Sequence, residues 1–264
     1  MASAHTHQDP STGEDCGDIL VFVHGYNTSP ADVVDRHRQL RRDLANKGFD
    51  GAVVSFDWPS DDRAINYLED RSDAKKTALT LVDDCITLFA ATQFRGCRIN
   101  LHVVAHSMGA YLVREAFDDA DDRPAIAHSN WTISQLCLLG ADVSSGSMSA
   151  SDSRSRSLYR HCTRLTNYQN PYDAALKLSN VKRAGVAPRA GRRGLPDKHA
   201  EKAVNVNCGD HYKAAYEGDS GNGHSWYFRD EVFLADLAQT LAGDLDSRVV
   251  GVRRSDSSGD LHLL

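Results

Sequence analysis

The sequence predicts an α/β fold, with a mostly parallel central sheet of about six or more strands and helices on both faces. Short apolar runs rich in β-branched residues alternate along the chain with longer segments of helical periodicity. The runs are apolar throughout, as expected of parallel strands that are buried on both faces. The 264 residues are enough to bury a large core, and no linker or internal repeat divides them.

The predicted alternation begins with the apolar run at 19–23, which we interpret as the first strand. Ser29, with Pro30 directly after it, is typical of a helix start, and Gly48 marks the end of that helix. Further strands are expected at 52–57, 99–105, 133–141, 164–167 and 203–207, and further helices at 72–93, from 110, at 174–178 and at 230–241.

A serine lies where the strand at 99–105 turns sharply into the following helix. The sequence from 105 to 109 reads Ala-His-Ser-Met-Gly. Small residues two positions before and after the serine are needed at such a turn, because larger side chains would collide with neighbouring backbone. The pattern is typical of the nucleophile elbow of α/β-hydrolases, with alanine in place of the usual first glycine. We therefore predict the α/β-hydrolase fold, with Ser107 as its nucleophile.

A serine nucleophile needs a general base, and the base needs an acid that orients it. In this fold the three follow one another in the order serine, acid, histidine. His224, in a loop beside a glycine after the last predicted strand, is the expected base in preference to His211, whose surroundings are less flexible. Asp173, after the second strand beyond the serine, is the expected acid. Asp142, after the first such strand, is the alternative.

The developing negative charge on a substrate oxygen needs two backbone N–H donors, which form an oxyanion hole. Met108, directly after the serine, is expected to supply one donor. Tyr26, after the turn at Gly25 that follows the first strand, is expected to supply the other. We find no dinucleotide, phosphate-loop or metalloprotease motif and therefore expect no cofactor and no metal. The acidic run at 118–122 is expected to be a solvated turn, with a metal site as the less favoured alternative.

Five segments resemble a known family. They read His-Gly-Tyr-Asn (24–27), Phe-Asp-Trp-Pro-Ser (56–60), Ala-His-Ser-Met-Gly (105–109), Asn-Pro-Tyr-Asp (170–173) and Gly-His-Ser (223–225). Together they are similar to the bacterial α/β-hydrolase family of largely unknown function, whose members are often esterase- or lipase-like. The resemblance runs from about 18 to 241, and it implies that Ser107, Asp173 and His224 form a catalytic triad.

These observations predict a serine hydrolase that cleaves carboxylic esters through an acyl-enzyme, with a small-molecule ester of short acyl chain as substrate. Neither the Ser-rich segment at 144–157 nor the basic loop at 182–198 carries the apolar helical stripe of an interfacial lid. Three alternatives remain open at this point. They are an acyltransferase with the same triad, a lipase with the same triad, and a non-catalytic binding module with this fold.

Composition and charge indicate which binding partners and which cellular location to expect. The net charge of −6 argues against nucleic acid or an anionic membrane as a partner. The polar start of the chain and the lack of a long apolar stretch favour a cytoplasmic protein without stable membrane association. The six scattered cysteines are expected to be free thiols. The oligomeric state is not predicted.

The predicted domain spans residues 18–245. Residues 1–17 are expected to be a disordered N-terminal segment, and residues 246–264 a flexible C-terminal tail. Within the domain, 144–157 is expected to be a loop or flexible flap because it is rich in serine and has no periodicity. The basic loop at 182–198 is expected to be a solvated surface.

Overall fold

The structure is a computed structural model, and it describes residues 6–8, 13, 15–60, 67–93, 98–181, 187–216, 223–243, 251–257 and 260–264. The strands in these ranges are β1 (Thr6–Gln8), β2 (Asp15–Val23), β3 (Ala52–Phe56), β4 (Ile99–His106), β5 (Ile133–Leu139), β6 (Cys162–Gln169), β7 (Ala203–Asn207), β8 (Arg253–Ser255) and β9 (Leu261–Leu263). They form one sheet in the order β1-β2-β4-β5-β6-β7-β9-β8, with β3 paired to β2. Among these strands, β1 and β8 run antiparallel to their neighbours and the other pairs are parallel. The mostly parallel sheet is therefore confirmed.

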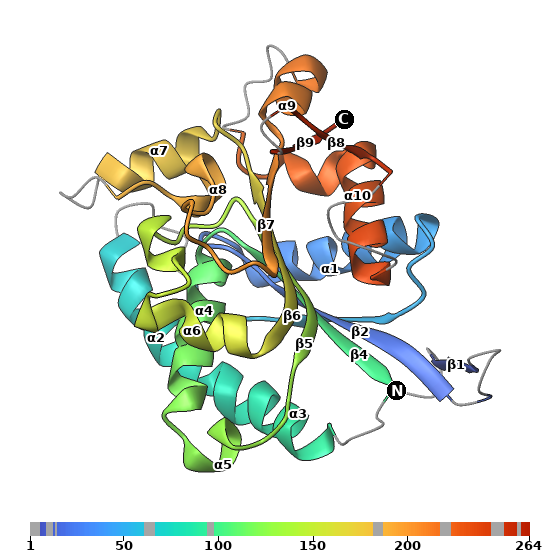
Figure 1. Cartoon of the computed structure of the whole chain (residues 1–264), viewed down its shortest axis with the longest axis vertical. Helices are drawn as coiled ribbons and strands as arrows, with labels where there is room; N and C mark the ends of the chain where they lie inside the picture. Colours follow the sequence, from blue (N-terminus) through green and yellow to red (C-terminus); the bar gives the residue numbers. More distant parts are fainter. Residues whose placement is uncertain are drawn as a thin grey trace.

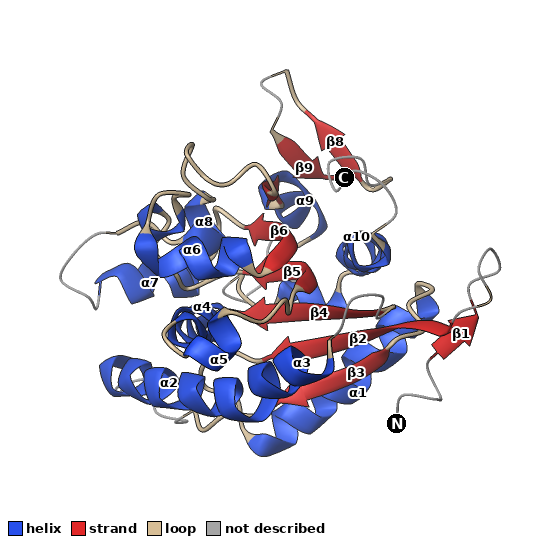
Figure 2. Ribbon diagram, turned by 60° about the horizontal axis from the view of Figure 1, so that its bottom comes forward, coloured by secondary structure: helices blue, strands red, loops and turns tan. Residues whose placement is uncertain are grey.

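Helices cover both faces of the sheet (Figures 1 and 2). Their bounds are α1 (Pro30–Asn46), α2 (Tyr67–Leu81), η2 (Val82–Ile86), α3 (Thr87–Thr92), α4 (Met108–Asp121), α5 (Pro124–Ala127), η3 (Gly146–Met148), α6 (Ser153–Arg160), α7 (Ala174–Val181), α8 (Ala190–Arg193), α9 (Gly209–Ala215), η4 (Trp226–Arg229) and α10 (Glu231–Ala242). The buried side chains of α2, α4 and α6 form the core on one face, and those of α1 and α10 form it on the other.

The strand residues divide between these two cores by simple alternation. In β2, Val21 and Val23 belong to the core under α2 and α4, whereas Leu20 and Phe22 belong to the core under α1 and α10. Successive side chains of a strand point to opposite faces, so a strand between two helix layers must be apolar at every position. This arrangement explains the unbroken apolar runs of the sequence.

Helix α1 begins where the sequence predicts. The Ser29 side chain accepts a hydrogen bond from the backbone of Asp32, and the Asp32 carboxylate accepts one from the backbone of Ser29. This capping box satisfies two N–H groups that the first helical turn leaves without partners. The long helix expected at 72–93 is instead three successive pieces, because a π-helical turn, η2, separates α2 from α3.

The Ser-rich segment is more ordered than the sequence predicts. It contains η3 and the start of α6, where Asp152 caps the helix by accepting from the backbone of Arg154 at 3.0 Å. Ser147 and Ser155 are buried, and each hydroxyl donates to a nearby backbone carbonyl. The serines act here as helix caps and local hydrogen-bond donors, so the expected loop or flap at 144–157 is corrected to a packed helical segment.

The domain also extends beyond both predicted boundaries. At the start, β2 begins at Asp15 and pairs with β1. At the end, β9 adds a parallel strand beside β7, and β8 turns back along β9. Leu261 and Leu263 are buried, and Arg253 forms an ion pair with Asp236 of α10 at 2.6 Å. For the described part of the tail, the expected flexibility is therefore corrected, because Arg253, Leu261 and Leu263 are bound to the core. Residues 246–250, 258 and 259 lie outside the described residues.

The basic loop at 182–198 is described from 187 onward, and 182–186 lie outside the described residues. Arg189 is buried, so at this residue the expected solvated surface is wrong. In the acidic run, Asp119 pairs with Arg123 and Asp121 pairs with Arg160.

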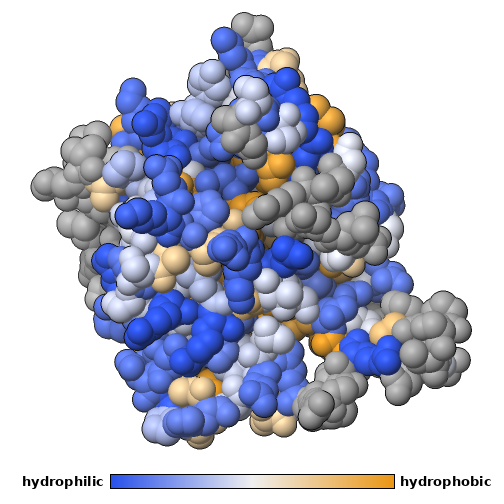
Figure 3. All heavy atoms as spheres, viewed as in Figure 1, coloured by the Kyte–Doolittle hydropathy of each residue, from blue (hydrophilic) through white to orange (hydrophobic). Residues whose placement is uncertain are grey.

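No helix in the described ranges has both the length and the apolar character needed to cross a membrane. The face drawn in Figure 3 is largely hydrophilic, with small separate apolar patches.

Candidate active site

Ser107 lies in a sharp turn between β4 and α4. Its backbone has φ 56° and ψ −122°, a conformation that residues other than glycine seldom adopt. The turn lies so close to the end of β2 that a Cβ atom on Gly109 would be 2.4 Å from the carbonyl oxygen of His24. Glycine is therefore required at this position for a steric reason, as the sequence pattern predicts.

The structure brings the three predicted catalytic residues together. Nε2 of His224 lies 2.7 Å from Oγ of Ser107, and Nδ1 of His224 lies 2.6 Å from Oδ2 of Asp173. Ser107 follows β4, Asp173 follows β6, and His224 lies between α9 and η4. The carboxyl ends of parallel strands meet at one edge of a sheet, and the two short distances bring these distant segments together there.

Asp173 is fully buried and uses its two oxygens for different partners. Oδ1 accepts the backbone N–H of Leu176 at 2.8 Å, in the first turn of α7, and Oδ2 faces His224. A carboxylate can only accept, so the proton between the two side chains lies on Nδ1 of His224. Nε2 is then left with a lone pair that can accept the hydroxyl proton of Ser107.

The charges around His224 favour its protonated form. Burial is the largest single effect and lowers the pKa of this imidazole, but the charge of Asp173, the hydrogen bond to it and the charge of Asp142 together outweigh burial. The net result is a pKa above the usual histidine value. A base with a raised pKa holds the proton that it takes from a serine more strongly.

The two alternatives from the sequence lie elsewhere. Asp142 forms a buried ion pair with Arg189, at 3.1 Å, and its backbone N–H donates to the carbonyl of Ser107. His211 lies 2.9 Å from Asp230, whose other oxygen caps α10. Neither side chain therefore holds the position that Asp173 or His224 occupies beside Ser107.

The predicted oxyanion loop lies directly beside the serine. A Cβ atom on Gly25 would be 2.8 Å from Cβ of Ser107, so only glycine lets the two turns approach this closely. Tyr26 follows Gly25 in this loop. Met108 is the first residue of α4, where backbone N–H groups have no partner within the helix. Gly25 and the start of α4 thus lie beside Ser107, and the role of Tyr26 and Met108 as donors stays a prediction.

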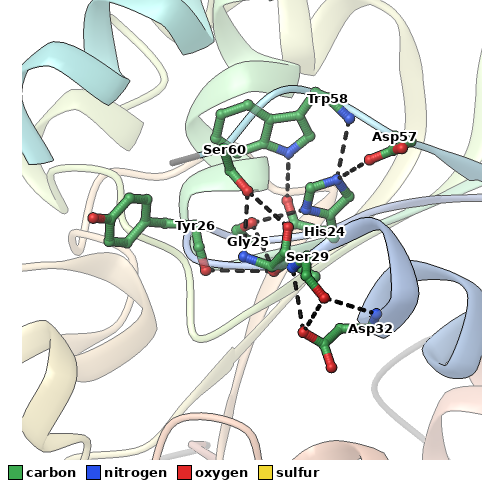
Figure 4. A network of polar contacts seen from close by, with 9 residues as sticks. His24, Gly25, Tyr26, Ser29, Asp32, Asp57, Trp58 and Ser60 are labelled. Carbon is green, nitrogen blue, oxygen red and sulfur yellow. Dashed lines mark hydrogen bonds and ion pairs between the residues drawn. The ribbon is translucent and has the colours of Figure 1, made fainter. Parts of the chain in front are cut away.

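The sequence analysis did not assign a role to the side chains that fix this loop (Figure 4). Nδ1 of His24 donates to the carbonyl of Gly25 at 2.8 Å, and Nε2 accepts the backbone N–H of Trp58 at 3.1 Å. The indole N–H of Trp58 donates to the His24 carbonyl at 2.9 Å. Burial lowers the pKa of His24, although the Gly25 carbonyl and Asp57 act in the opposite direction. The segment quoted above as Phe-Asp-Trp-Pro-Ser was the signal for this support.

A family model described as an alpha/beta hydrolase of unknown function (DUF900) matches residues 4–206. This match spans well over half of the chain. The chain belongs to this family. The matched residues include Ser107, Asp173 and both predicted oxyanion residues, and they end before His224.

This α/β-hydrolase is also similar to several known proteins. An uncharacterized protein of Nostoc sp. (strain PCC 7120) is 31% identical over 81 residues, which are 31% of this chain and 20% of that protein. The match thus spans about one fifth of the length of that relative. A cutinase-like protein from Cryptococcus sp. has 12% identity and a TM-score of 0.40, over 90% of this chain and 96% of its own. Esterase B from Lactobacillus rhamnosis, with a bound phosphonate inhibitor, has 11% identity and a TM-score of 0.41, over 86% and 75%.

The described part of this α/β-hydrolase holds no cluster of three or more His, Cys, Asp or Glu side chains that could bind a metal ion. Its cysteines in these ranges are free thiols at 16, 85, 137, 162 and 208, and Cys97 lies outside them. Burial raises the pKa of the Cys137 thiol to about 12. Ser107, by contrast, has Nε2 of His224 2.7 Å from its hydroxyl.

Proposed function

We propose that this protein is a serine hydrolase that cleaves small carboxylic esters through an acyl-enzyme on Ser107. The observation that carries the proposal is the position of His224, with one ring nitrogen 2.7 Å from the Ser107 hydroxyl and the other 2.6 Å from Asp173. This is the arrangement of a nucleophile, a general base and an orienting acid.

In the first half of the reaction, Oγ of Ser107 attacks the ester carbonyl carbon and its proton passes to Nε2 of His224. The carbonyl oxygen becomes negatively charged, and the backbone N–H groups of Tyr26 and Met108 donate to it. The tetrahedral intermediate then expels the alcohol, which takes the proton from His224. The products of this half are a free alcohol and an acyl ester on Ser107.

In the second half, a water molecule gives a proton to Nε2 of His224 and attacks the acyl carbonyl. The same two N–H groups stabilise the second oxyanion. When this intermediate collapses, the proton returns from His224 to Oγ of Ser107 and the carboxylic acid leaves. Asp173 stays ionised throughout and stabilises the imidazolium that forms in each half.

We propose short acyl chains because the segments around the site are polar. The Ser-rich segment at 144–157 is held by hydrogen bonds from Ser147 and Ser155 to backbone carbonyls. It carries no apolar stripe that could bind an oil–water interface. Each additional methylene in an apolar pocket contributes about 0.8 kcal/mol, so the preference should rise briefly with chain length and fall once the pocket is full.

The test is hydrolysis of chromogenic esters from acetyl to dodecanoyl by the wild-type protein and by Ser107→Ala. We expect short-chain esters to be preferred and Ser107→Ala to lower kcat by about 10⁶-fold. Activity of the variant within tenfold of wild type would contradict Ser107 as nucleophile. A maximum at the longest chains, or a rise in rate when the substrate forms micelles, would indicate the lipase alternative. Absence of turnover with every ester, together with no labelling of Ser107 by a phosphonate, would favour the binding module.

A further inference from the structure

The backbone of His224 is held by two side chains that come from the ends of different strands. Nε2 of His106, the last residue of β4, lies 2.9 Å from the carbonyl oxygen of His224. The side-chain amide of Asn170, directly after β6, donates to the carbonyl oxygen of Gly223 at 2.9 Å. Two consecutive peptide groups are therefore fixed from two sides.

His106 is built to act as a donor here. A carbonyl oxygen can only accept, so the proton of the His106 ring lies on Nε2. Burial, together with the neighbouring His224, holds the pKa of His106 well below its usual value, and the ring is therefore neutral. Its ring centre lies 4.7 Å from that of His224 and 5.2 Å from that of Phe228, which leaves little room for it to turn.

Phe228, which packs against the His106 ring, is held in turn by two side chains of α1. The guanidinium of Arg36 lies 3.9 Å from the centre of the Phe228 ring, and the side-chain amide of Gln39 donates to the carbonyl of Phe228. Phe228 belongs to η4, the turn that follows His224. The chain on the C-terminal side of His224 is thus fixed to a helix that the reaction does not use.

We propose that His106 and Asn170 are positioning residues that hold the imidazole of His224 between Ser107 and Asp173. This inference rests on the proposed function of those three residues. His224 lies in a turn without regular secondary structure, and a backbone rotation there would move its ring away from both partners. A misplacement of about 1 Å in a reacting group can cost about 10²-fold in rate. Hydrogen bonds to the carbonyls of 223 and 224 restrict that rotation.

The test compares two substitutions of the same residue. His106→Phe keeps an aromatic ring against Phe228 but removes the donor, whereas His106→Gln can place an amide N–H near the position of Nε2. We expect His106→Phe to lower kcat by about tenfold to 10²-fold with KM changed less than about twofold. His106→Gln should retain most of kcat.

A matched control separates positioning from general loss of stability. His102 is buried on the same strand, and its Nε2 lies 3.0 Å from Asp18 at the opposite end of the sheet. His102→Phe removes a buried donor in the same way, and we expect its kcat to stay at the wild-type value. Equal losses in His106→Phe and His102→Phe, or equal activity of His106→Phe and His106→Gln, would overturn the proposal.

Asn170 is tested by Asn170→Asp, which removes the donor to Gly223 and keeps the oxygen that accepts the backbone N–H of Tyr172 at 3.0 Å. We expect the same loss of kcat with little change in KM. If this buried carboxyl prevents folding, the uncharged Asn170→Ser takes its place. Wild-type kcat in the folded variant would overturn the role of Asn170.

A second measurement does not depend on turnover. The proton on Nδ1 of His224, in its short hydrogen bond to Asp173, should give a far-downfield proton resonance, identified by its loss in His224→Gln. We expect this resonance to be retained in His106→Gln and His102→Phe and to be shifted or broadened in His106→Phe. If the wild-type protein cleaves no ester, the proposed function fails, and this comparison still decides the role of His106. An unchanged resonance in His106→Phe would overturn that role.

Discussion

Asp142 and Arg189 form an ion pair with 3.1 Å between Oδ1 and Nε, and the side chains are only 2% and 3% exposed. This pair lies at the same edge of the sheet as Ser107, because the backbone of Asp142 donates to the Ser107 carbonyl. Asp142 is thus paired with Arg189, whereas Nδ1 of His224 faces Oδ2 of Asp173 at 2.6 Å. The structure therefore gives different partners to Asp142 and Asp173, the two acids that the sequence analysis left as alternatives.

The first prediction concerns these two acids. Asp173→Asn should lower kcat by about 10⁴-fold, because an amide at this position would favour the wrong tautomer of His224. Asp142→Asn should lower kcat less than about tenfold, but it should lower the melting temperature because it leaves Arg189 buried without its carboxylate. Steady-state kinetics and thermal unfolding of both variants give the comparison. The opposite ranking of kcat would make Asp142 the functional acid.

The second prediction is a pH dependence. Protonated His224 cannot accept the proton of Ser107, so kcat/KM should fall as the pH is lowered through the pKa of His224. That pKa is raised, mainly by Asp173 against the effect of burial, so the midpoint should lie above the usual histidine value of about 6.5. In Asp142→Asn the midpoint should move to lower pH. A wild-type midpoint at or below the usual value, measured over about pH 5 to 9, would contradict this prediction.

The same pKa shift has the opposite effect on stability. A histidine whose pKa is raised by folding stabilises the folded state below its unfolded pKa, and this contribution is lost as the pH rises through the folded pKa. Lowering the pH until kcat/KM falls should therefore protonate His224 without breaking its pair with Asp173. Circular dichroism at the same pH values distinguishes titration of His224 from acid unfolding of the protein.

The third prediction concerns the oxyanion loop. A methyl group on Gly25 would lie 2.8 Å from Cβ of Ser107 and 3.0 Å from Nδ1 of His106, so Gly25→Ala must push the loop away from the serine. Loss of one oxyanion donor costs about 10² to 10³-fold in kcat, and we expect a loss of that size. Gly146→Ala is the matched control, since its methyl group would meet only Oγ of Ser144, at 4.0 Å. Similar kcat values for the two variants would contradict the placement of Tyr26 in the oxyanion hole.

The fourth prediction tests the C-terminal hairpin. Arg253 is buried and donates to both carboxylate oxygens of Asp236, at 2.6 and 2.7 Å. Arg253→Met should lower the free energy of unfolding by about 3–5 kcal/mol, because it leaves a buried carboxylate without its counter-charge. Arg254, the next residue, makes a surface ion pair with Asp210, and Arg254→Met should cost less than about 1 kcal/mol. Chemical denaturation measures both, and equal costs would show that the hairpin is not bound to the core.

The sequence by itself determined the order of the elements and the local chemistry of the turns. The apolar runs of β2, β4 and β5 and the cap at Ser29 depend on neighbours along the chain, so their signals are local. The elbow at Ser107 is local as well, because its small residues are required by a single turn. The order Ser107, Asp173, His224 also follows from the chain, and the catalytic role of these residues stays a prediction.

The tertiary structure decided what depends on distant partners. His224 faces Asp173, whereas Asp142 pairs with Arg189, which lies 47 residues beyond it in the chain. The tail joins the sheet because Arg253 pairs with the buried carboxylate of Asp236 and β9 pairs with the edge of β7. His106 has a role only because the His224 carbonyl lies 2.9 Å from its ring, across 118 residues of sequence. Such contacts form when the sheet is assembled, and composition and periodicity carry no record of them.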